Sequence, residues 1–162
     1  MDSKQPRSSG PDLQGEGAAV DAVNRRLLVA LSQDPRLGVS ALARLVDMSA
    51  PAVRERLNRL EQAGVIRGYR LDVDPAALGL PVSAWVRIHP GPRQLPKLIE
   101  LVAGIKQVSE CHRITGEDCI LLRVHVATIE DLEPLLDNFL VHGETTSSFI
   151  VSTPVAPRTI LP

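Results

Sequence analysis

Residues 49–59 combine small side chains with arginines, which is the chemistry that double-helical nucleic acid requires of a partner. The small residues at the start let a backbone approach base edges in a major groove, and the arginines that follow can hold phosphates. Alanine methyls can touch thymine methyls, and the Glu55 carboxylate can accept a hydrogen bond from cytosine N4. We therefore predict a DNA-contacting surface made of Ser49, Ala50, Pro51, Ala52, Arg54, Glu55, Asn58 and Arg59.

Two short helices joined by a tight turn would position this surface. Ser40 and Ser49 are the expected N-caps of the two helices, and Gly64 follows the second helix as a stop. Apolar residues recur at helical spacing, as Leu42, Leu45 and Val46 in the first helix and as Val53, Leu57 and Leu60 in the second. A plain helical hairpin with a solvated charged face gives the same pattern, and Glu55 can equally pair with Arg59 one turn away.

The flanking segments and the local charge favour DNA contact over that alternative. A further helix is predicted from about residue 19 to residue 32, and residues 65–71 are typical of a short two-stranded wing. Between Ser40 and Arg70 there are six arginines and three acids, although the whole chain has a net charge of −1. Positive charge is therefore concentrated where the DNA-contacting surface is predicted.

The second half of the chain predicts a different architecture. Strands are expected at residues 82–89, 108–115, 119–126 and 145–153, with one helix at about residues 95–104. A second helix follows a capping box of Thr128 and Asp131, and its inner stripe is predicted to be Ile129, Leu132, Leu136 and Phe139. The order βαββαβ is the ferredoxin-like pattern. The predicted fold class is α+β, with an N-terminal winged helix-turn-helix before this C-terminal domain.

Composition divides the chain into five segments. Residues 1–18 are a polar tail, 19–71 the winged helix-turn-helix, 72–80 a linker, 81–153 the βαββαβ domain and 154–162 a second tail. No apolar run of about 18 residues and no apolar signal core is present, which predicts a cytoplasmic, nucleoid-associated protein with no membrane partner.

Two helices can cover only one face of a four-stranded sheet. The other face is expected to carry Trp85, Leu121 and β-branched residues, and such a patch is rarely left in water. A second copy of the chain, packed sheet against sheet, would cover it. The resulting homodimer would present two recognition helices about a two-fold axis, which suits a palindromic double-stranded DNA site.

Several segments together resemble the Lrp/AsnC (leucine-responsive, feast/famine) family of transcription factors. They are VDAVNRRLLVAL, LARLVDMSAPAVRERLNRLEQAGVIRGY, the ALG of the linker and VSECHRITGEDCILLRVHV. The resemblance spans residue 20 to about residue 152. It implies a winged helix-turn-helix, an effector domain that dimerises, further association into octamers or similar rings, and an amino acid or related small molecule held between dimers.

The sequence departs from the family pattern at two places. Asn24 stands where the family usually has a second aspartate after Asp21, and this change is expected to alter only local capping. The effector turn usually reads Gly-x-x-Asp, whereas Gly116 is followed here by Glu117, Asp118 and then Cys119. The acidic group of the turn is therefore shifted or replaced.

An amino-acid effector offers an ammonium and a carboxylate, and the turn has suitable partners for both. Gly116 lets the backbone approach a ligand, and acids stand beside it. The candidate effector residues are Thr115, Gly116, Glu117 and Asp118, together with Thr145 and Thr146 from a neighbouring subunit. The alternative is a hairpin turn with solvated acids.

Three other functions are disfavoured by the sequence: metal binding, tetrapyrrole chemistry and an accessory role without DNA binding. The cysteines and histidines match no zinc spacing, so packed thiols and edge histidines are expected in place of a metal, and no cofactor is predicted. These residues are His89, Cys111, His112, Cys119 and His125.

Some relatives of the family decarboxylate a modified tetrapyrrole of the siroheme type, and that function would require a cluster of Arg87, His89, His112, Arg113, Arg123 and His125. The intact surface at residues 49–59 disfavours an accessory subunit that has lost DNA binding. The leading prediction is a regulator without catalysis.

Overall fold

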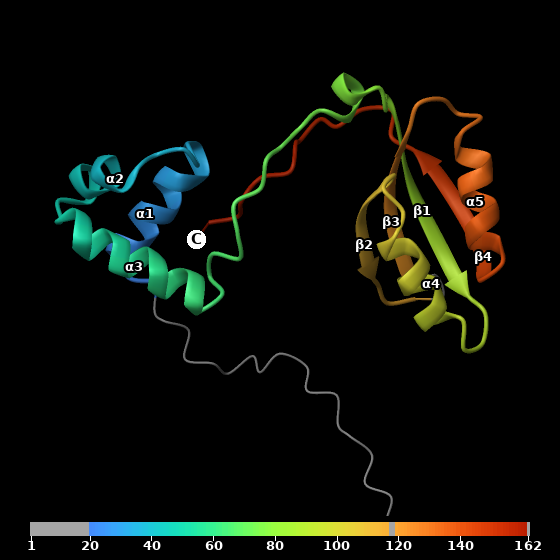
Figure 1. The fold of residues 1–162 in the computed structure, drawn as a ribbon, viewed down its shortest axis with the longest axis horizontal. Helices are drawn as coiled ribbons and strands as arrows, with labels where there is room; N and C mark the ends of the chain where they lie inside the picture. The colour runs from blue at the N-terminus through green and yellow to red at the C-terminus, as the bar shows by residue number, and fades with distance from the viewer. Residues whose placement is uncertain (1–19, 117–118, 162) are drawn as a thin grey trace, which may run out of the picture. The chain divides into compact units, whose positions relative to one another are not determined.

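The computed structural model describes residues 20–116 and 119–161, and the chain divides into two compact units (Figure 1). One unit extends to Leu71 and includes the residues from Pro157 onward, and the other comprises Asp72–Ala156. Each unit has a hydrophobic core of its own. Within the described residues, no helix is both long and apolar enough to cross a bilayer.

Three helices form the first unit: α1 (Ala22–Gln33), α2 (Val39–Val46) and α3 (Ala50–Gln62). Their apolar residues meet in one core, which contains Leu27, Leu31, Leu42, Ala43, Val46, Val53 and Leu57. Asp47 makes the tight turn between α2 and α3 with a left-handed backbone (φ 56°), a conformation that aspartate tolerates better than most residues. Ser49 then caps α3 as predicted, because its hydroxyl accepts from the Ala52 N–H at 3.4 Å.

The predicted start of α2 was wrong by two residues. Gly38 is the N-cap, and its carbonyl already accepts from the N–H groups of Ala41 at 2.9 Å and Leu42 at 3.1 Å. Ser40 therefore lies inside the first turn and caps nothing. Leu45 also differs from the prediction, since it is 51% exposed and does not belong to the buried stripe.

The predicted two-stranded wing is absent, because residues 65–71 contain no strand. The Ile66 N–H donates to the Leu60 carbonyl and closes the end of α3, and the chain then runs extended. Leu71 is 88% exposed, and the Tyr69 hydroxyl donates to Glu61 at 3.2 Å. A hairpin of two strands is marginal unless it buries an apolar face, and this segment buries almost none. The linker contains one short 3-10 turn at Pro75–Leu78.

The second unit has the predicted βαββαβ order. Its elements are β1 (Val82–Pro90), α4 (Leu95–Ala103), β2 (Val108–Arg113), β3 (Ile120–Val126), α5 (Leu132–Leu140) and β4 (Gly143–Phe149). The strands form one antiparallel sheet in the order β2-β3-β1-β4. The last strand begins and ends earlier than the predicted residues 145–153.

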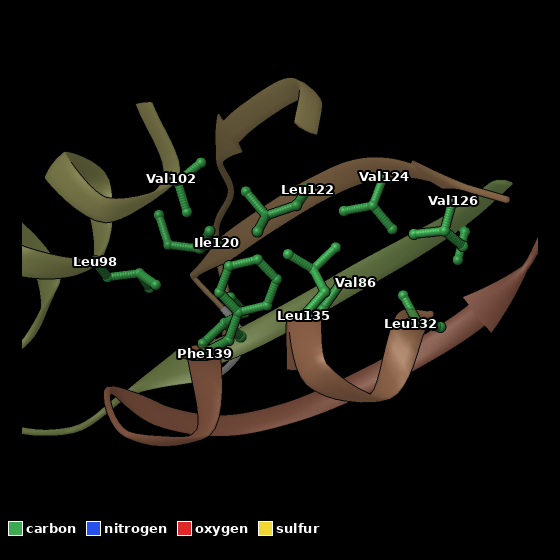
Figure 2. Packing of buried hydrophobic residues seen from close by; sticks show 12 residues of the cluster. Val86, Leu98, Val102, Ile120, Leu122, Val124, Val126, Leu132, Leu135 and Phe139 are labelled. Atoms are coloured by element: carbon green, nitrogen blue, oxygen red, sulfur yellow. The ribbon is translucent and has the colours of Figure 1, made fainter. Parts of the chain in front are cut away.

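Helices α4 and α5 cover one face of this sheet (Figure 2). Alternate residues of β1 and β3 enter the core against them: Ala84, Val86, Ile88, Ile120, Leu122, Val124 and Val126. The Thr128–Asp131 capping box is confirmed, since Asp131 N–H donates to Thr128 Oγ1 at 3.2 Å and Thr128 N–H donates to Asp131 Oδ2 at 3.0 Å. Ile129 lies within this capping turn, before the helix starts, and is 59% exposed, whereas Leu135 is buried and was not predicted.

Gly143 is where β4 starts against β1, and the two backbones approach closely there. A Cβ at position 143 would lie 2.1 Å from the His89 carbonyl oxygen and 2.7 Å from Pro90 Cα. The Gly91 N–H also donates to the His142 carbonyl at 2.8 Å, which ties the two loops together. Any side chain at 143 must therefore push backbone away from backbone.

We expect Gly143→Ala to lower the free energy of unfolding of the second unit by about 1–3 kcal/mol, because the strands must separate to admit the methyl group. Urea unfolding followed by Trp85 fluorescence measures this change. Gly104→Ala is the matched control, since its nearest neighbour would be at an ordinary 3.5 Å. Equal stability of the two variants would contradict the close approach.

Candidate nucleic-acid interface and effector turn

One side of α3 is anchored in the core and the opposite side is exposed. Val53, Leu57 and Leu60 are buried, so at 100° per residue the outermost ridge consists of Pro51, Glu55, Asn58 and Gln62. Of the predicted DNA-contacting residues, six are exposed: Ser49, Pro51, Arg54, Glu55, Asn58 and Arg59. Ala50 and Ala52 are half-buried, and Ala50 packs against the core. Gln62 extends the ridge and was missed, because glutamine at a helix end gives no sequence signal.

Two grooves flank this ridge within the first unit. One has a volume of about 410 Å³ and is lined by Asp21, Asn24, Met48, Ala52, Glu55, Arg56, Arg59 and Leu60. The other, of about 300 Å³, lies on the side of Arg54 and Asn58 and is bordered by Tyr69. Arg59 therefore borders the first groove and Arg54 the second.

Glu55 and Arg59 pair in the free protein. Arg59 Nε donates to Glu55 Oε1 at 3.0 Å, and both side chains are more than half exposed. The alternative interpretation of Glu55, an ion pair one turn away, thus describes its state without DNA. An exposed pair of this kind contributes only about 0.3–0.5 kcal/mol, so base and phosphate contacts can replace it.

Arg56 points to the scaffold instead of the outer surface. Its Nη1 donates to Asp21 Oδ2 at 2.6 Å and to Asn24 Oδ1 at 3.0 Å. Asp21 uses its other oxygen to cap α1 by accepting from the Asn24 N–H at 2.7 Å. The hydrogen bond from Asn24 and the one from Arg56 together lower the pKa of Asp21. Counting charge along the sequence could not reveal this pairing.

The effector turn closes between β2 and β3, where the Ile114 N–H donates to the Cys119 carbonyl at 2.9 Å. Gly116 has a φ of 115°, a conformation that side-chain-bearing residues rarely adopt, and among the described residues beyond its chain neighbours none would lie within 4 Å of a Cβ there. Thr115 is exposed beside it. Glu117 and Asp118 lie outside the described residues. Cys119 is half-buried and packs against the core of the second unit.

Thr145 and Thr146 do not lie on the same face of the sheet. Thr145 stands opposite the buried Ile88, whereas Thr146 stands opposite Arg87 on the uncovered face. Strand β1 also separates β4 from β3 and the effector turn. Both threonines lie at the end of the sheet that carries the turn, but only one of them can face any given site.

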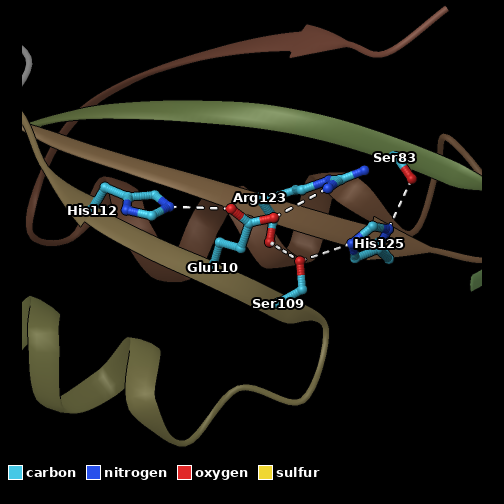
Figure 3. A network of polar contacts seen from close by, with 6 residues as sticks. All are labelled: Ser83, Ser109, Glu110, His112, Arg123 and His125. Atoms are coloured by element: carbon cyan, nitrogen blue, oxygen red, sulfur yellow. Dashed lines mark hydrogen bonds and ion pairs between the residues drawn. The ribbon is translucent and has the colours of Figure 1, made fainter. Parts of the chain in front are cut away.

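The uncovered face of the sheet is more polar than expected. His125 lies between two serines, with Nδ1 2.8 Å from Ser83 Oγ and Nε2 2.9 Å from Ser109 Oγ (Figure 3). Beside it, Arg123 Nη1 donates to Glu110 Oε1 at 3.1 Å, and His112 Nε2 lies 3.1 Å from Glu110 Oε2. Trp85 and Leu121 are present as predicted, but they share the face with this network.

Each member of the network restrains another. Burial raises the pKa of Glu110, but the hydrogen bonds from His112 and Arg123 outweigh that effect and leave the pKa lowered. The Arg123 guanidinium also lies 5.9 Å from the centre of the Trp85 ring. Of the residues that a tetrapyrrole site would need, Arg123 and His112 both contact Glu110, and His125 contacts two serines. Arg113 stands opposite Ile120, on the face of the sheet that the helices cover.

Two family models match this chain. A model described as the Lrp/AsnC ligand binding domain matches residues 82–160, and one described as a winged helix-turn-helix DNA-binding domain matches residues 20–67. The transcriptional regulator LrpA of Mycobacterium tuberculosis is 34% identical over 147 residues, which cover 89% of this chain and 98% of LrpA. The chain belongs to the Lrp/AsnC family.

Solved structures agree with this assignment to the Lrp/AsnC family. The Bacillus subtilis LrpC structure matches with a TM-score of 0.80 and 28% identity, over 85% of this chain and 98% of LrpC. The feast or famine regulatory protein Rv3291c of M. tuberculosis, complexed with L-methionine, matches with a TM-score of 0.80 and 33% identity, over 89% of this chain and all of that one. The predicted α+β fold, an N-terminal helix-turn-helix followed by a βαββαβ domain, is therefore confirmed, apart from the two strands of the wing.

The two departures from the Lrp/AsnC pattern have different structural consequences. Asn24 does more than alter capping, because its side-chain oxygen accepts from Arg56 as well. Cys119 and Cys111 are both free thiols, and Cys111 stands opposite Leu122 in the sheet. Among the described residues, no three or more His, Cys, Asp or Glu side chains are grouped so that they could hold a metal ion.

His125 makes stability depend on pH. Burial lowers its pKa, Arg123 lowers it further and Glu110 opposes the shift, so the folded protein favours the neutral ring. The unfolded ring titrates near pH 6.5, so the contribution is complete above about pH 6.5 and is lost as the pH falls through the lower folded pKa.

We expect His125→Gln to reduce the loss of unfolding free energy between pH 7 and pH 5, because glutamine can bond both serines without titrating. Urea unfolding at fixed protein concentration and several pH values measures this loss. His142→Gln is the control for removing a histidine, since His142 bonds Gln94 elsewhere in the unit. The same pH dependence in wild type and His125→Gln would contradict the assignment.

Proposed function

We propose that this chain is a sequence-specific DNA-binding transcriptional regulator whose activity or assembly responds to an amino acid or related small molecule. The observation that carries the proposal is the exposed ridge of α3, which stands opposite a buried stripe and has Arg54 on one flank and Arg59 on the other. The names of the relatives, which are transcriptional regulators, support it.

In the proposed complex α3 enters the major groove with its N-terminal end closest to the bases. Ala52, Glu55 and Asn58 are the candidates for base edges, since a methyl, a carboxylate and an amide each recognise a different base pattern. Arg54 and Arg59 hold phosphates on either side. Arg59 uses only its Nε–H to bond Glu55, so its remaining N–H groups can bind a phosphate, and the second Glu55 oxygen can accept from cytosine.

For the effector we propose the turn of Thr115, Gly116, Glu117 and Asp118, with Thr146 supplied by a neighbouring subunit. A relative complexed with L-methionine supports an amino acid as the ligand class. Thr145 is a weaker candidate than the sequence indicated, because it faces the helices and not the uncovered side of the sheet.

The proposed assembly is a homodimer in which a second copy covers the uncovered sheet face, with dimers associating into a higher oligomer such as an octamer. Trp85 and Leu121 supply apolar area, and the network of Glu110, His112 and Arg123 requires a partner surface that matches it in charge. We propose a nucleoid-associated, cytoplasmic protein that performs no catalysis.

We expect Arg54→Ala and Arg59→Ala each to weaken binding to an operator duplex, which can be selected from a random-sequence library with the wild-type protein. Each lost phosphate contact should lower the slope of log affinity against log salt by about 0.9. Fluorescence anisotropy across a salt series measures this slope. Lys97→Ala is the control, since it removes an equally exposed charge from α4 of the second unit. Unchanged affinity and slope in both arginine variants would refute the interface.

We expect Gly116→Val to abolish the effector response while the protein still folds and binds DNA. The substitution strains a backbone at φ 115° at a cost of about 1–3 kcal/mol and fills the space that a ligand would occupy. Calorimetry and gel shift with a panel of amino acids that includes L-methionine measure the response. Gly79→Val, at φ 81° in the linker and also in open space, controls for strain alone. Effector binding by Gly116→Val equal to wild type would place the site elsewhere.

A further inference from the structure

Asp21 connects two elements that are far apart in the sequence. Its Oδ1 caps α1 through the Asn24 N–H, and its Oδ2 lies 2.6 Å from Nη1 of Arg56 in the middle of α3. The same Nη1 reaches the Asn24 side-chain oxygen at 3.0 Å. One guanidinium nitrogen thus joins α3 to both the cap and the first turn of α1.

Arg56 is poorly placed to hold DNA directly. It lies next to the buried stripe of Val53, Leu57 and Leu60, away from the ridge, and only 30% of its side chain is exposed. Its charge is already matched by a carboxylate at close range. The hydrogen bonds from the Asn24 N–H and from Arg56 lower the pKa of Asp21, which favours the charged carboxylate.

Among the described residues, a few polar contacts supplement the apolar core that the three helices share. Helix α2 packs against both α1 and α3, whereas α1 and α3 approach each other little along their backbones. Arg26 of α1 donates to the Leu45 carbonyl at the end of α2 and secures that pair. Within the described residues, the polar contact between α1 and α3 consists of the Asp21–Arg56 ion pair and the hydrogen bond from Arg56 to Asn24.

We propose that the Asp21–Arg56 pair, completed by Asn24, is a positioning device that sets the orientation of α3 for DNA binding and makes no contact with DNA itself. The inference rests on the proposed function. The pair borders the same groove as Glu55 and Arg59, so a change in the angle of α3 moves both residues relative to the phosphates. Arg56 and Asp21 therefore act through Arg59 and the ridge.

Asp21→Asn separates this role from simple electrostatics. Asparagine is as good an N-cap as aspartate, so α1 keeps its start, but the ion pair to Arg56 is lost. Removing a negative charge near bound DNA should by itself strengthen binding. If the pair positions α3, Asp21→Asn should instead weaken operator binding, by about tenfold, which corresponds to about 1.4 kcal/mol.

Arg56→Gln and the double variant complete the experiment. We expect Arg56→Gln to weaken binding by a similar factor without changing the salt slope, and the double variant to bind about as well as either single one, since the pair is broken only once. Urea unfolding of each variant establishes that the protein is folded under the binding conditions. Lys106→Gln, an exposed lysine of the second unit, controls for the loss of one positive charge.

Three results would overturn the positioning role. A slope reduced by about 0.9 in Arg56→Gln would make Arg56 a phosphate contact. Equal or stronger binding by Asp21→Asn would show that the pair does not orient α3, and additive losses in the double variant would show that the two residues act separately. If the wild-type protein selected no duplex at all, the proposed function would fail first, and the positioning role would fail with it.

Discussion

The burial of Val53, Leu57 and Leu60 on one side of α3 is the constraint on which the DNA-contacting surface depends. Because these side chains are anchored in the core, the opposite ridge must face outward, whatever residues it carries. The tight turn at Asp47 and the Ser49 cap fix where the helix begins. The choice of ridge residues is then free to encode recognition without cost to the fold.

Alternation along β1 and β3 plays the same part in the second unit. One set of side chains builds the core beneath α4 and α5, and the other set lies on the uncovered face. That face carries a network of polar groups that range from the buried His125 to the exposed His112, and its buried members are costly to leave unpaired. Within the described residues Arg123 Nε is buried without a partner, so a matching surface that supplies an acceptor would fit this face.

Most of the fold followed from sequence periodicity, because caps, helical stripes and alternating strands are local signals. Ser49, Thr128 and Asp131 perform the capping roles predicted for them, and the strand order is that of the ferredoxin-like pattern. The errors have local causes as well. A glycine two residues upstream took the cap expected of Ser40, and the apolar residues of the predicted wing, such as Tyr69 and Leu71, stay exposed.

The site was harder to predict, because its features depend on contacts between distant residues. Thr145 and Thr146 are adjacent in the sequence, and for that reason alternation directs them to opposite faces. The polarity of the uncovered face arises from β1, β2 and β3 together, and no one of these strands indicates it.

The distribution of charge on the first unit shows how pairing changes the meaning of a sequence count. Six arginines lie between Ser40 and Arg70, but two of them are already paired in the free protein. Arg56 is paired with an acid of α1 in a half-buried position, where exchange for a phosphate would leave Asp21 facing the DNA alone. Arg59 is paired on the open surface, where exchange costs little. The half-buried Arg56 therefore stabilises the arrangement of the helices, whereas the exposed Arg59 can exchange its partner for DNA. The difference in burial accounts for the two roles.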